Sequence, residues 1–332
     1  MRINFIDNSK AIAILLVIVG HTDGIPQILK CFIFSFHMPA FFFISGYLLK
    51  INKFEMKFLS FTKEQFRKLI VPYFFFGMIS ILYSITKHTL TGLEFNIYSA
   101  LNGFTYGNSE GLVNITLWFF TCLFSTSIIS FLLFKKFTSI TIVCFSFVLG
   151  LGVCFFHSLI PFRPPWNMDL SIVSLFFYSL GHLVAQASDR NSQLTMTPYR
   201  MVLLLIGTAA LLYLANKNGR VDMAFMVFRD PLLFFLNACI GVALLLVLSF
   251  SIPVTLGALF LSKNTIILFP LHPIFFSIFT GIGMIVFTVP HDFQISYYWS
   301  VIYTCGAIAF CYPISIIFTK FFPFVIGKRK EE

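Results

Sequence analysis

Residues 6–24 read IDNSKAIAILLVIVGHTDG, and residues 32–50 read FIFSFHMPAFFFISGYLLK. Each stretch is mostly apolar over nearly the ~20 residues that a helix needs to cross a bilayer. Each also carries a histidine well inside its apolar run, which is costly in hydrocarbon. The two runs follow each other closely and therefore predict two consecutive, antiparallel membrane helices with polar groups at depth.

The composition of the whole chain agrees with a lipid environment. Hydrophobic residues make up 58% of the 332 residues and charged residues 11%, and the mean hydropathy is +0.89. Soluble domains carry roughly 25% charged residues. The chain has too little polar surface to cover a core of this size in water.

Ten segments have the length and composition of membrane spans. They are 11–28, 31–50, 69–86, 114–134, 138–158, 169–187, 200–216, 231–250, 265–288 and 295–318. The apolar stretch 252–261 is too short to cross alone and is expected to be interfacial or to extend a neighbour. We therefore predict an all-α integral membrane bundle of about ten helices, forming a single domain over residues 1–332 with no soluble domain.

The distribution of positive charge predicts the orientation of this bundle. With both termini inside, most of the 23 Lys and Arg residues lie in inner segments. This bias is the usual signature of cytoplasmic loops and favours an N-in, C-in arrangement with an even number of spans. The net charge of +10 is thereby explained without a nucleic-acid partner, and the basic segments are expected to contact membrane lipid.

The first segment places three ionisable residues on one helix face. Asp7 and Lys10 are one turn apart, and Lys10 and His21 differ by about 20° around the helix. His21 lies about 16 Å from Lys10 along the axis, which is near mid-bilayer. Lys10 could be only a topogenic charge that extends toward the interface, but ionisable residues at membrane depth indicate function by default.

The second segment places His37 at a similar depth, about 20 Å from its Lys50 end. Two imidazoles at one level could handle protons, since histidine gains and loses a proton near neutral pH. The alternative is that a histidine in a span only hydrogen-bonds a neighbouring helix.

A cluster of basic residues follows the second segment. It includes Lys63, Arg67 and Lys68, of which the first two are spaced i, i+4 and share a helix face. Positive-inside bias and anionic lipid suffice to explain it. A cradle for a multiply phosphorylated ligand is the more specific interpretation.

Four further residues are candidates for substrate binding. Trp118 and Trp166 are expected near the outer interface, with Asp169 at the mouth of the sixth span; His272 lies between two prolines of the ninth. Aromatic rings beside polar groups suit sugars, but the same set suits an interfacial aromatic belt. No zinc, Walker-type or nucleophile-elbow spacing occurs, and we expect no metal.

Six fragments, in order along nearly the whole chain, resemble the acyltransferase-3 family and most closely its branch of fucose-4-O-acetylase-like proteins. They are IDNSKAIAILLVIVGH, FHMPAFFFISGYL, FRKLIVPY, LWFFTCLF, PWNMDLSIVSLFFYSLGHL and LSKNTIILFPLHP. The family has an Arg-x10-His pattern in its first span. Here the histidine is His21, and Lys10 stands in place of the arginine, which keeps the charge but loses the bidentate fork.

The resemblance implies a membrane O-acetyltransferase in a bacterial inner (plasma) membrane. It would move an acetyl group from cytoplasmic acetyl-CoA to a hydroxyl of a cell-surface glycan, such as an O-antigen or capsule, or of its lipid-linked precursor. His21 would act as general base or acyl relay, with His37 orienting it and Lys10 and Asp7 at the entrance. The CoA phosphates would meet the basic cluster, and the acceptor would meet the aromatic residues.

Two other classes of protein share some of these features. A proton-coupled transporter also has intramembrane His, Lys and Asp residues and proline-broken helices, but no inverted repeat is visible. A scaffold of a polysaccharide-assembly complex has no need for buried ionisable residues on one face. Consumption of acetyl-CoA by membranes separates the enzyme from both.

Overall fold

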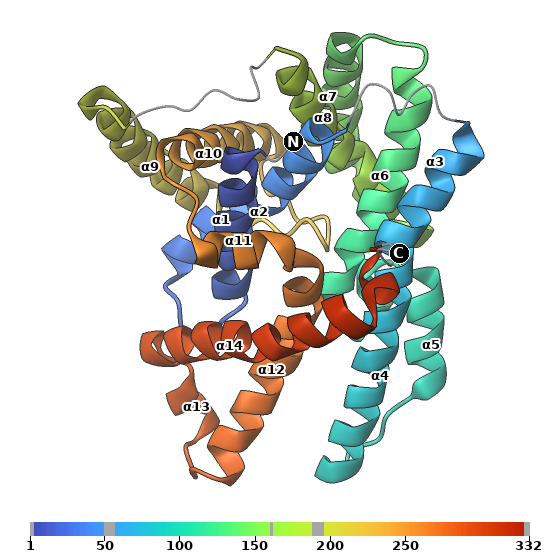
Figure 1. Cartoon of the computed structure of the whole chain (residues 1–332), viewed down its shortest axis with the longest axis vertical. Helices are drawn as coiled ribbons and strands as arrows, with labels where there is room; N and C mark the ends of the chain where they lie inside the picture. The colour runs from blue at the N-terminus through green and yellow to red at the C-terminus, as the bar shows by residue number, and fades with distance from the viewer. Residues whose placement is uncertain (1–2, 50–56, 160–161, 188–195, 329–332) are drawn as a thin grey trace.

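The computed structural model describes residues 3–49, 57–159, 162–187 and 196–328. Its regular elements are helices (Figure 1). The α-helices are α1 (Asn4–Gly20), α2 (Gln27–Tyr47), α3 (Phe58–Gln65), α4 (Val71–Thr91), α5 (Ile97–Tyr106), α6 (Trp118–Phe134), α7 (Ser139–Phe156), α8 (Met168–Ala187), α9 (Pro198–Asn218), α10 (Pro231–Ser251), α11 (Leu256–Lys263), α12 (Thr265–Ile285), α13 (His291–Gln294) and α14 (Tyr297–Phe321). Short turns of other helix types are η2 (Phe66–Ile70), η3 (Ser109–Gly111), η4 (Ile115–Leu117), η5 (His157–Leu159), η6 (Pro165–Asn167) and η7 (Pro323–Ile326).

The predicted all-helical membrane fold is confirmed. Within the described ranges, nine helices are long and apolar enough to cross a membrane, and they coincide with nine of the ten predicted segments. The third of these segments is part of a helical rod from Phe58 to Thr91 that includes the π-helical turn η2. The N-in, C-in orientation remains a prediction.

The tenth predicted segment, 11–28, overlaps α1, but this helix begins at Asn4 and ends at Gly20 after 17 residues. It is therefore shorter than a typical span. Side chains at its end take up its last carbonyls: His21 Nδ1 donates to the carbonyl of Val17 at 2.8 Å, and Thr22 Oγ1 donates to that of Val19 at 2.7 Å. These side chains add to the backbone bonds that His21 and Thr22 make to the same two carbonyls, and together they close the end of the helix.

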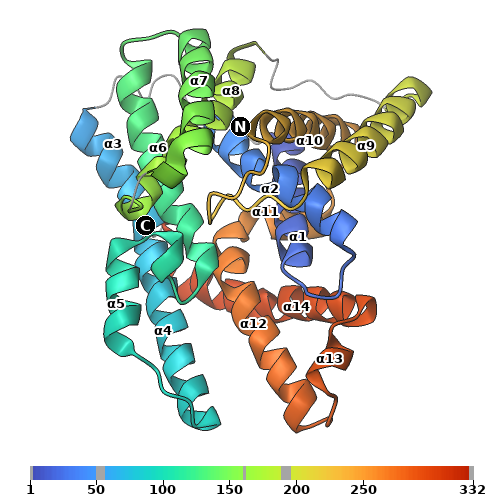
Figure 2. The same cartoon turned by 180° about the vertical axis from the view of Figure 1, so that it is seen from behind.

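Helices α1 and α2 lie in the middle of the molecule, as the front and back views show (Figure 1, Figure 2). Helix α2 packs against α1, α8, α9 and α10, and α1 packs against α10, α11 and α12. Helix α14 runs across the molecule at a steep angle to α12. The two helices that carry the predicted catalytic residues are thus enclosed by the others.

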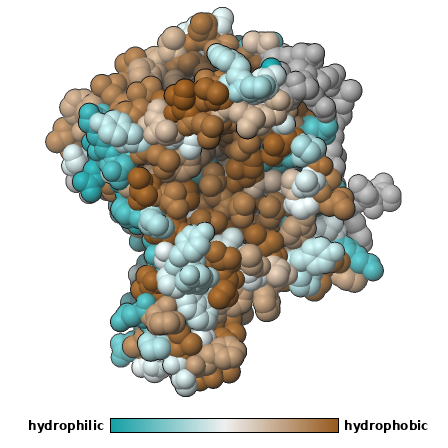
Figure 3. Space-filling model, turned by 90° about the vertical axis from the view of Figure 1, so that its left-hand side faces the viewer, coloured by the Kyte–Doolittle hydropathy of each residue, from teal (hydrophilic) through white to brown (hydrophobic). Residues whose placement is uncertain are grey.

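The outer surface is apolar, as expected where lipid is the solvent. Large side chains of α9 point outward, among them Leu205 and Ile206. Hydrophobic residues cover most of the face shown in Figure 3, and hydrophilic residues gather mainly along its edges. The interior, by contrast, holds many buried Ser, Thr and Asn side chains, which hydrogen-bond within the bundle.

Two glycines allow α2 and α8 to approach each other closely. A Cβ on Gly46 would overlap the carbonyl oxygen of Tyr178, and one on Gly181 would overlap that of Phe43. Small residues at helix interfaces permit this close backbone contact in membrane proteins. The contact fixes the position of α2, which contributes residues to both cavities described below.

We expect Gly181→Ala to lower the stability of the detergent-solubilised protein by at least about 1–3 kcal/mol, the usual cost of overpacking. Gly152→Ala is the matched control, because a Cβ there meets nothing within 4 Å. Thermal unfolding followed by size-exclusion chromatography measures both. Equal stability of the two variants would contradict the proposed close packing.

Candidate active site

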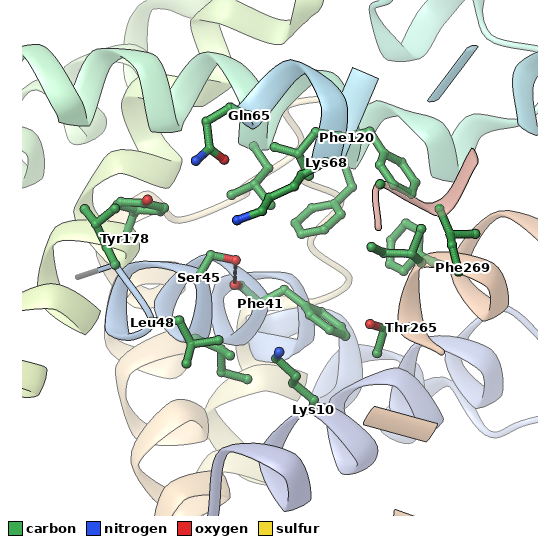
Figure 4. A pocket seen from close by; sticks show the side chains of 18 of the residues that line it. Lys10, Phe41, Ser45, Leu48, Gln65, Lys68, Phe120, Tyr178, Thr265 and Phe269 are labelled. Atoms are coloured by element: carbon green, nitrogen blue, oxygen red, sulfur yellow. Dashed lines mark hydrogen bonds between the residues drawn. The ribbon is translucent and has the colours of Figure 1, made fainter. Parts of the chain in front are cut away.

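A cavity of ≈ 440 Å³ lies between α1, α2, α6, α8, α12 and the α3–α4 rod. Lys10 and Lys68 point into it from opposite sides (Figure 4). Most of the remaining lining is apolar, with Ser45, Gln65, Tyr178 and Thr265 as the neutral polar exceptions among its side chains. A mostly apolar cavity with lysines in its wall suits a ligand with a charged head and a less polar tail.

Lys68 reaches the cavity because of its place on the α3–α4 rod. Gln65, Lys68 and Leu69 all line the cavity, and their i, i+3, i+4 spacing puts them on one helix face. Lys68 Nζ also pairs with Glu64 at 2.6 Å. Lys63 is exposed and Arg67 half-buried, and neither lines the cavity. The structure therefore brings only one of the three predicted CoA-binding residues to the cavity wall.

The C-terminal turn completes the charged side of this cavity. Gly327 and Lys328 both line it. Gly327 has φ +72°, and a Cβ on it would press against the backbone of Lys68. This close approach brings two distant lysines, Lys68 and Lys328, to the lining of the same cavity, which the sequence spacing does not reveal.

Asp7, unlike Lys10, does not line the larger cavity. Ser262 Oγ donates a hydrogen bond of 2.6 Å to Asp7 Oδ1. The contact joins α1 to α11. The geometry gives Asp7 a part in holding α1, one turn below the cavity lysine.

A second, smaller cavity of ≈ 120 Å³ lies around His21. His37 and Trp118 line it as well, together with the polar residues Thr116, Arg220 and Asp222. Helix α1 therefore contributes Lys10 to the larger cavity and its C-cap His21 to the smaller one, about 16 Å apart along the helix. Phe269 lines both cavities and marks the boundary between them.

Three imidazoles surround this region, and all are fixed in the same way. The Nδ1 atoms of His21, His37 and His272 donate to carbonyls one turn back, at 2.8, 2.8 and 3.1 Å. Because a carbonyl only accepts, Nδ1 carries the hydrogen and a neutral ring has its lone pair on Nε2. Each ring therefore presents a basic nitrogen away from its own helix.

The ring of His272 lies close to that of His21. Their centroids are 5.1 Å apart, with an interplanar angle of 68°. His272 is fully buried, and its Nε2 has no hydrogen-bond partner in the described structure. Phe34 contacts both His21 and His37, with ring centroids 5.7 and 5.0 Å away. His37 and His272 thus form one group with His21.

Asn114 fixes the helix that carries His272. Its Nδ2 donates to the carbonyl of Pro270 at 2.8 Å and to Ser80 Oγ at 3.0 Å. Pro270 and Pro273 lack the N–H groups that would continue the helix ladder. The buried amide therefore joins α4, η4 and α12 at the point where α12 is weakened.

Trp166 and Asp169 lie outside the smaller cavity, unlike Trp118. Trp166 is half-buried and donates from Nε1 to the carbonyl of Thr105 at 3.3 Å. Asp169 pairs with Arg163, whose Nε lies 2.8 Å from Oδ2. Arg163 Nη1 also donates to the carbonyl of Ala224, which does line the cavity. The Arg163–Asp169 pair therefore positions a neighbouring segment.

That segment is the hairpin 219–230, and sequence reasoning missed its importance. A single β-bridge joins Asp222 and Val227, and it brings Arg220 and Asp222 to the cavity of His21. Arg220 pairs with Asp222 at 3.5 Å and lies over the Phe34 ring at 4.6 Å. Burial raises the pKa of the Asp222 carboxyl, while Arg220 opposes this shift. In the sequence, Arg220 was only one positive charge in an outer loop.

A sequence model of the acyltransferase domain matches residues 3–319. The chain belongs to the acyltransferase-3 family. It is therefore an integral membrane acyltransferase, as the sequence motifs indicated. No curated protein and no solved structure matches it. The smaller cavity and all three histidines lie within the matched residues, whereas Ile326, Gly327 and Lys328 of the larger cavity follow them.

Replacing Asp169 by Ala should destabilise the protein by about 3–5 kcal/mol, because it leaves the nearly buried guanidinium of Arg163 without its partner. The double variant R163M/D169L should lose less, since it leaves no buried charge unpaired. Thermal unfolding in detergent measures both variants. If D169A keeps wild-type stability and loses only activity, Asp169 binds substrate and does not serve to position the hairpin.

Proposed function

We propose that this acyltransferase is an O-acetyltransferase of the fucose-4-O-acetylase-like branch. It would move an acetyl group from acetyl-CoA to a hydroxyl of a surface glycan or of its lipid-linked precursor. The observation that carries the proposal is the path along α1, from Lys10 in the larger cavity to His21 in the smaller one. Donor and acceptor would enter from opposite ends of this path.

The larger cavity is the proposed donor site. The positive-inside bias would place Lys68 and Lys328 on the cytoplasmic side, where acetyl-CoA is found. Charge-assisted hydrogen bonds from these two lysines would hold the CoA phosphates. Lys63 and Arg67, which lie on the same rod outside the cavity wall, would add longer-range attraction. The pantetheine arm would then run past Lys10 along the apolar lining toward His21.

The smaller cavity is the proposed acceptor site. Trp118 offers an aromatic face and Asp222 a carboxylate, a combination that suits a sugar ring with its hydroxyls. Arg220 beside them would orient the same ring. His272, behind His21, and His37 would keep the catalytic imidazole in place.

The proposed chemistry needs one base. His21 Nε2 takes the proton of the acceptor hydroxyl while the hydroxyl oxygen attacks the thioester carbonyl carbon. The new C–O ester bond forms, the C–S bond breaks, and CoA leaves as a thiolate that takes the proton back from the His21 imidazolium. In the alternative order, His21 Nε2 attacks the carbonyl carbon first and the C–S bond breaks, which releases CoA as a thiolate. The hydroxyl oxygen then attacks the acetyl carbon, the C–N bond to His21 breaks, and the hydroxyl proton goes to the thiolate.

Changing His21 to Ala should abolish glycan acetylation while protein levels stay normal, because the variant lacks the imidazole that would take the proton of the attacking hydroxyl. Mass spectrometry of the purified surface polysaccharide, from cells with wild type, H21A or no copy of the gene, measures the loss of one acetyl group. H291A is the control, since His291 is exposed on α13. An acetylated glycan in H21A cells would exclude the mechanism. Absence of acetyl in all strains would favour a proton-coupled transporter.

Lys10 allows a second test, based on charge. Lys10→Met should raise the KM for acetyl-CoA roughly 10- to 100-fold, since a hydrogen bond to a charged group contributes about 1.5–3 kcal/mol. Lys10→Arg, which restores the residue of the family pattern, should retain activity. Steady-state release of free CoA thiol measures KM and kcat. A methionine variant with unchanged KM would show that Lys10 serves only membrane topology.

A further inference from the structure

We propose that Phe41, Phe119 and Phe269, here called the phenyl triad, form the seat for the acyl group and limit it to a short chain. This inference rests on the proposed function, because it names which acyl-CoA the donor cavity accepts. The triad combines one ring each from α2, α6 and α12. These three side chains would then determine which acyl-chain lengths the enzyme accepts.

The three rings contact one another. The centroid of Phe41 is 5.7 Å from that of Phe119 and 6.1 Å from that of Phe269, and the Phe119 and Phe269 centroids are 5.2 Å apart. All three rings line the larger cavity and are buried. Together they form a continuous apolar wall on one side of it.

This wall lies where the donor cavity adjoins the cavity of His21. Phe269 belongs to the lining of both cavities, and Trp118, next to Phe119 in the chain, lines the cavity of His21. A thioester that passes from the donor cavity toward His21 passes Phe269, so its acyl chain would lie against the triad. The triad contains no hydrogen-bonding groups, so it selects the acyl group by size alone.

Neighbouring residues keep these rings in position. Phe269 precedes Pro270, whose carbonyl is bound by Asn114. Phe119 also packs edge-on against Phe42, with centroids 5.2 Å apart. Because protein interiors are close-packed, each additional methylene of a longer acyl chain must displace a supported ring.

The test measures binding, so it needs no knowledge of the acceptor. Wild-type protein in detergent is titrated with CoA and with acetyl- and butyryl-CoA analogues in which CH₂ replaces the thioester sulfur. We expect the acetyl analogue to bind at least about tenfold more tightly than the butyryl analogue, given that a misfit of one or two methylenes costs about 10- to 200-fold.

Variants then assign this preference to the triad. Phe119→Leu and Phe269→Leu should each move the ratio of the two dissociation constants toward one, because the smaller side chain leaves more room beside the acyl chain. Phe235→Leu is the matched control: Phe235 is equally buried, but it packs against Phe147, Phe176 and Phe177 and lines neither cavity. It should leave the ratio unchanged.

Each outcome decides the question. Equal binding of both analogues by wild type overturns the inference even where the leucine variants do not fold. A wild-type preference that both leucine variants keep also overturns it, because the preference then arises elsewhere. If wild type binds neither analogue nor CoA itself, the proposed donor site is wrong and the inference falls with it. Binding of CoA without chain-length preference rejects the inference alone.

Discussion

The backbone contact between α2 and α8 sets the position of the helix that contributes to both cavities. At Gly46 and Gly181 the two helices approach so closely that no side-chain atom fits between them. Helix α2 has little freedom to slide or rotate, and it carries His37 to one cavity and Phe41 to both the other cavity and the phenyl triad. In a bilayer, where no hydrophobic force drives helices together, such close packing is a main source of association.

Much of the fold could be predicted because the solvent restricts it so strongly. Hydrocarbon requires every backbone polar group to be satisfied internally, so apolar runs of sufficient length become helices. The prediction was weakest at the ends. It placed the first span at 11–28, whereas α1 ends at Gly20, where His21 and Thr22 bind its carbonyls. Side-chain capture of this kind depends on rotamers, which hydropathy does not encode.

The candidate site, like the fold, could be predicted from the sequence only in part. The spacing of residues along a single helix was enough to predict Lys10 and His21, because α1 carries Lys10 and ends at its C-cap His21. The partners of these residues come from distant segments. Lys328 reaches the larger cavity through a positive-φ glycine, and Arg220 and Asp222 reach the smaller one through a hairpin held by Arg163. Lys68, in place of the i, i+4 pair Lys63 and Arg67, faces the cavity, and no single-helix pattern determines which side of a rod faces inward.

The anchoring of the three imidazoles has a consequence for proton transfer. With Nδ1 bound to its own helix, each ring has one nitrogen available for exchange. A ring that conducts protons through a membrane receives them on one nitrogen and releases them from the other. A ring with one available nitrogen returns the proton by the path on which it arrived. In the proposed reaction, the proton that His21 takes from the acceptor hydroxyl would therefore leave from the same nitrogen, to the departing thiolate.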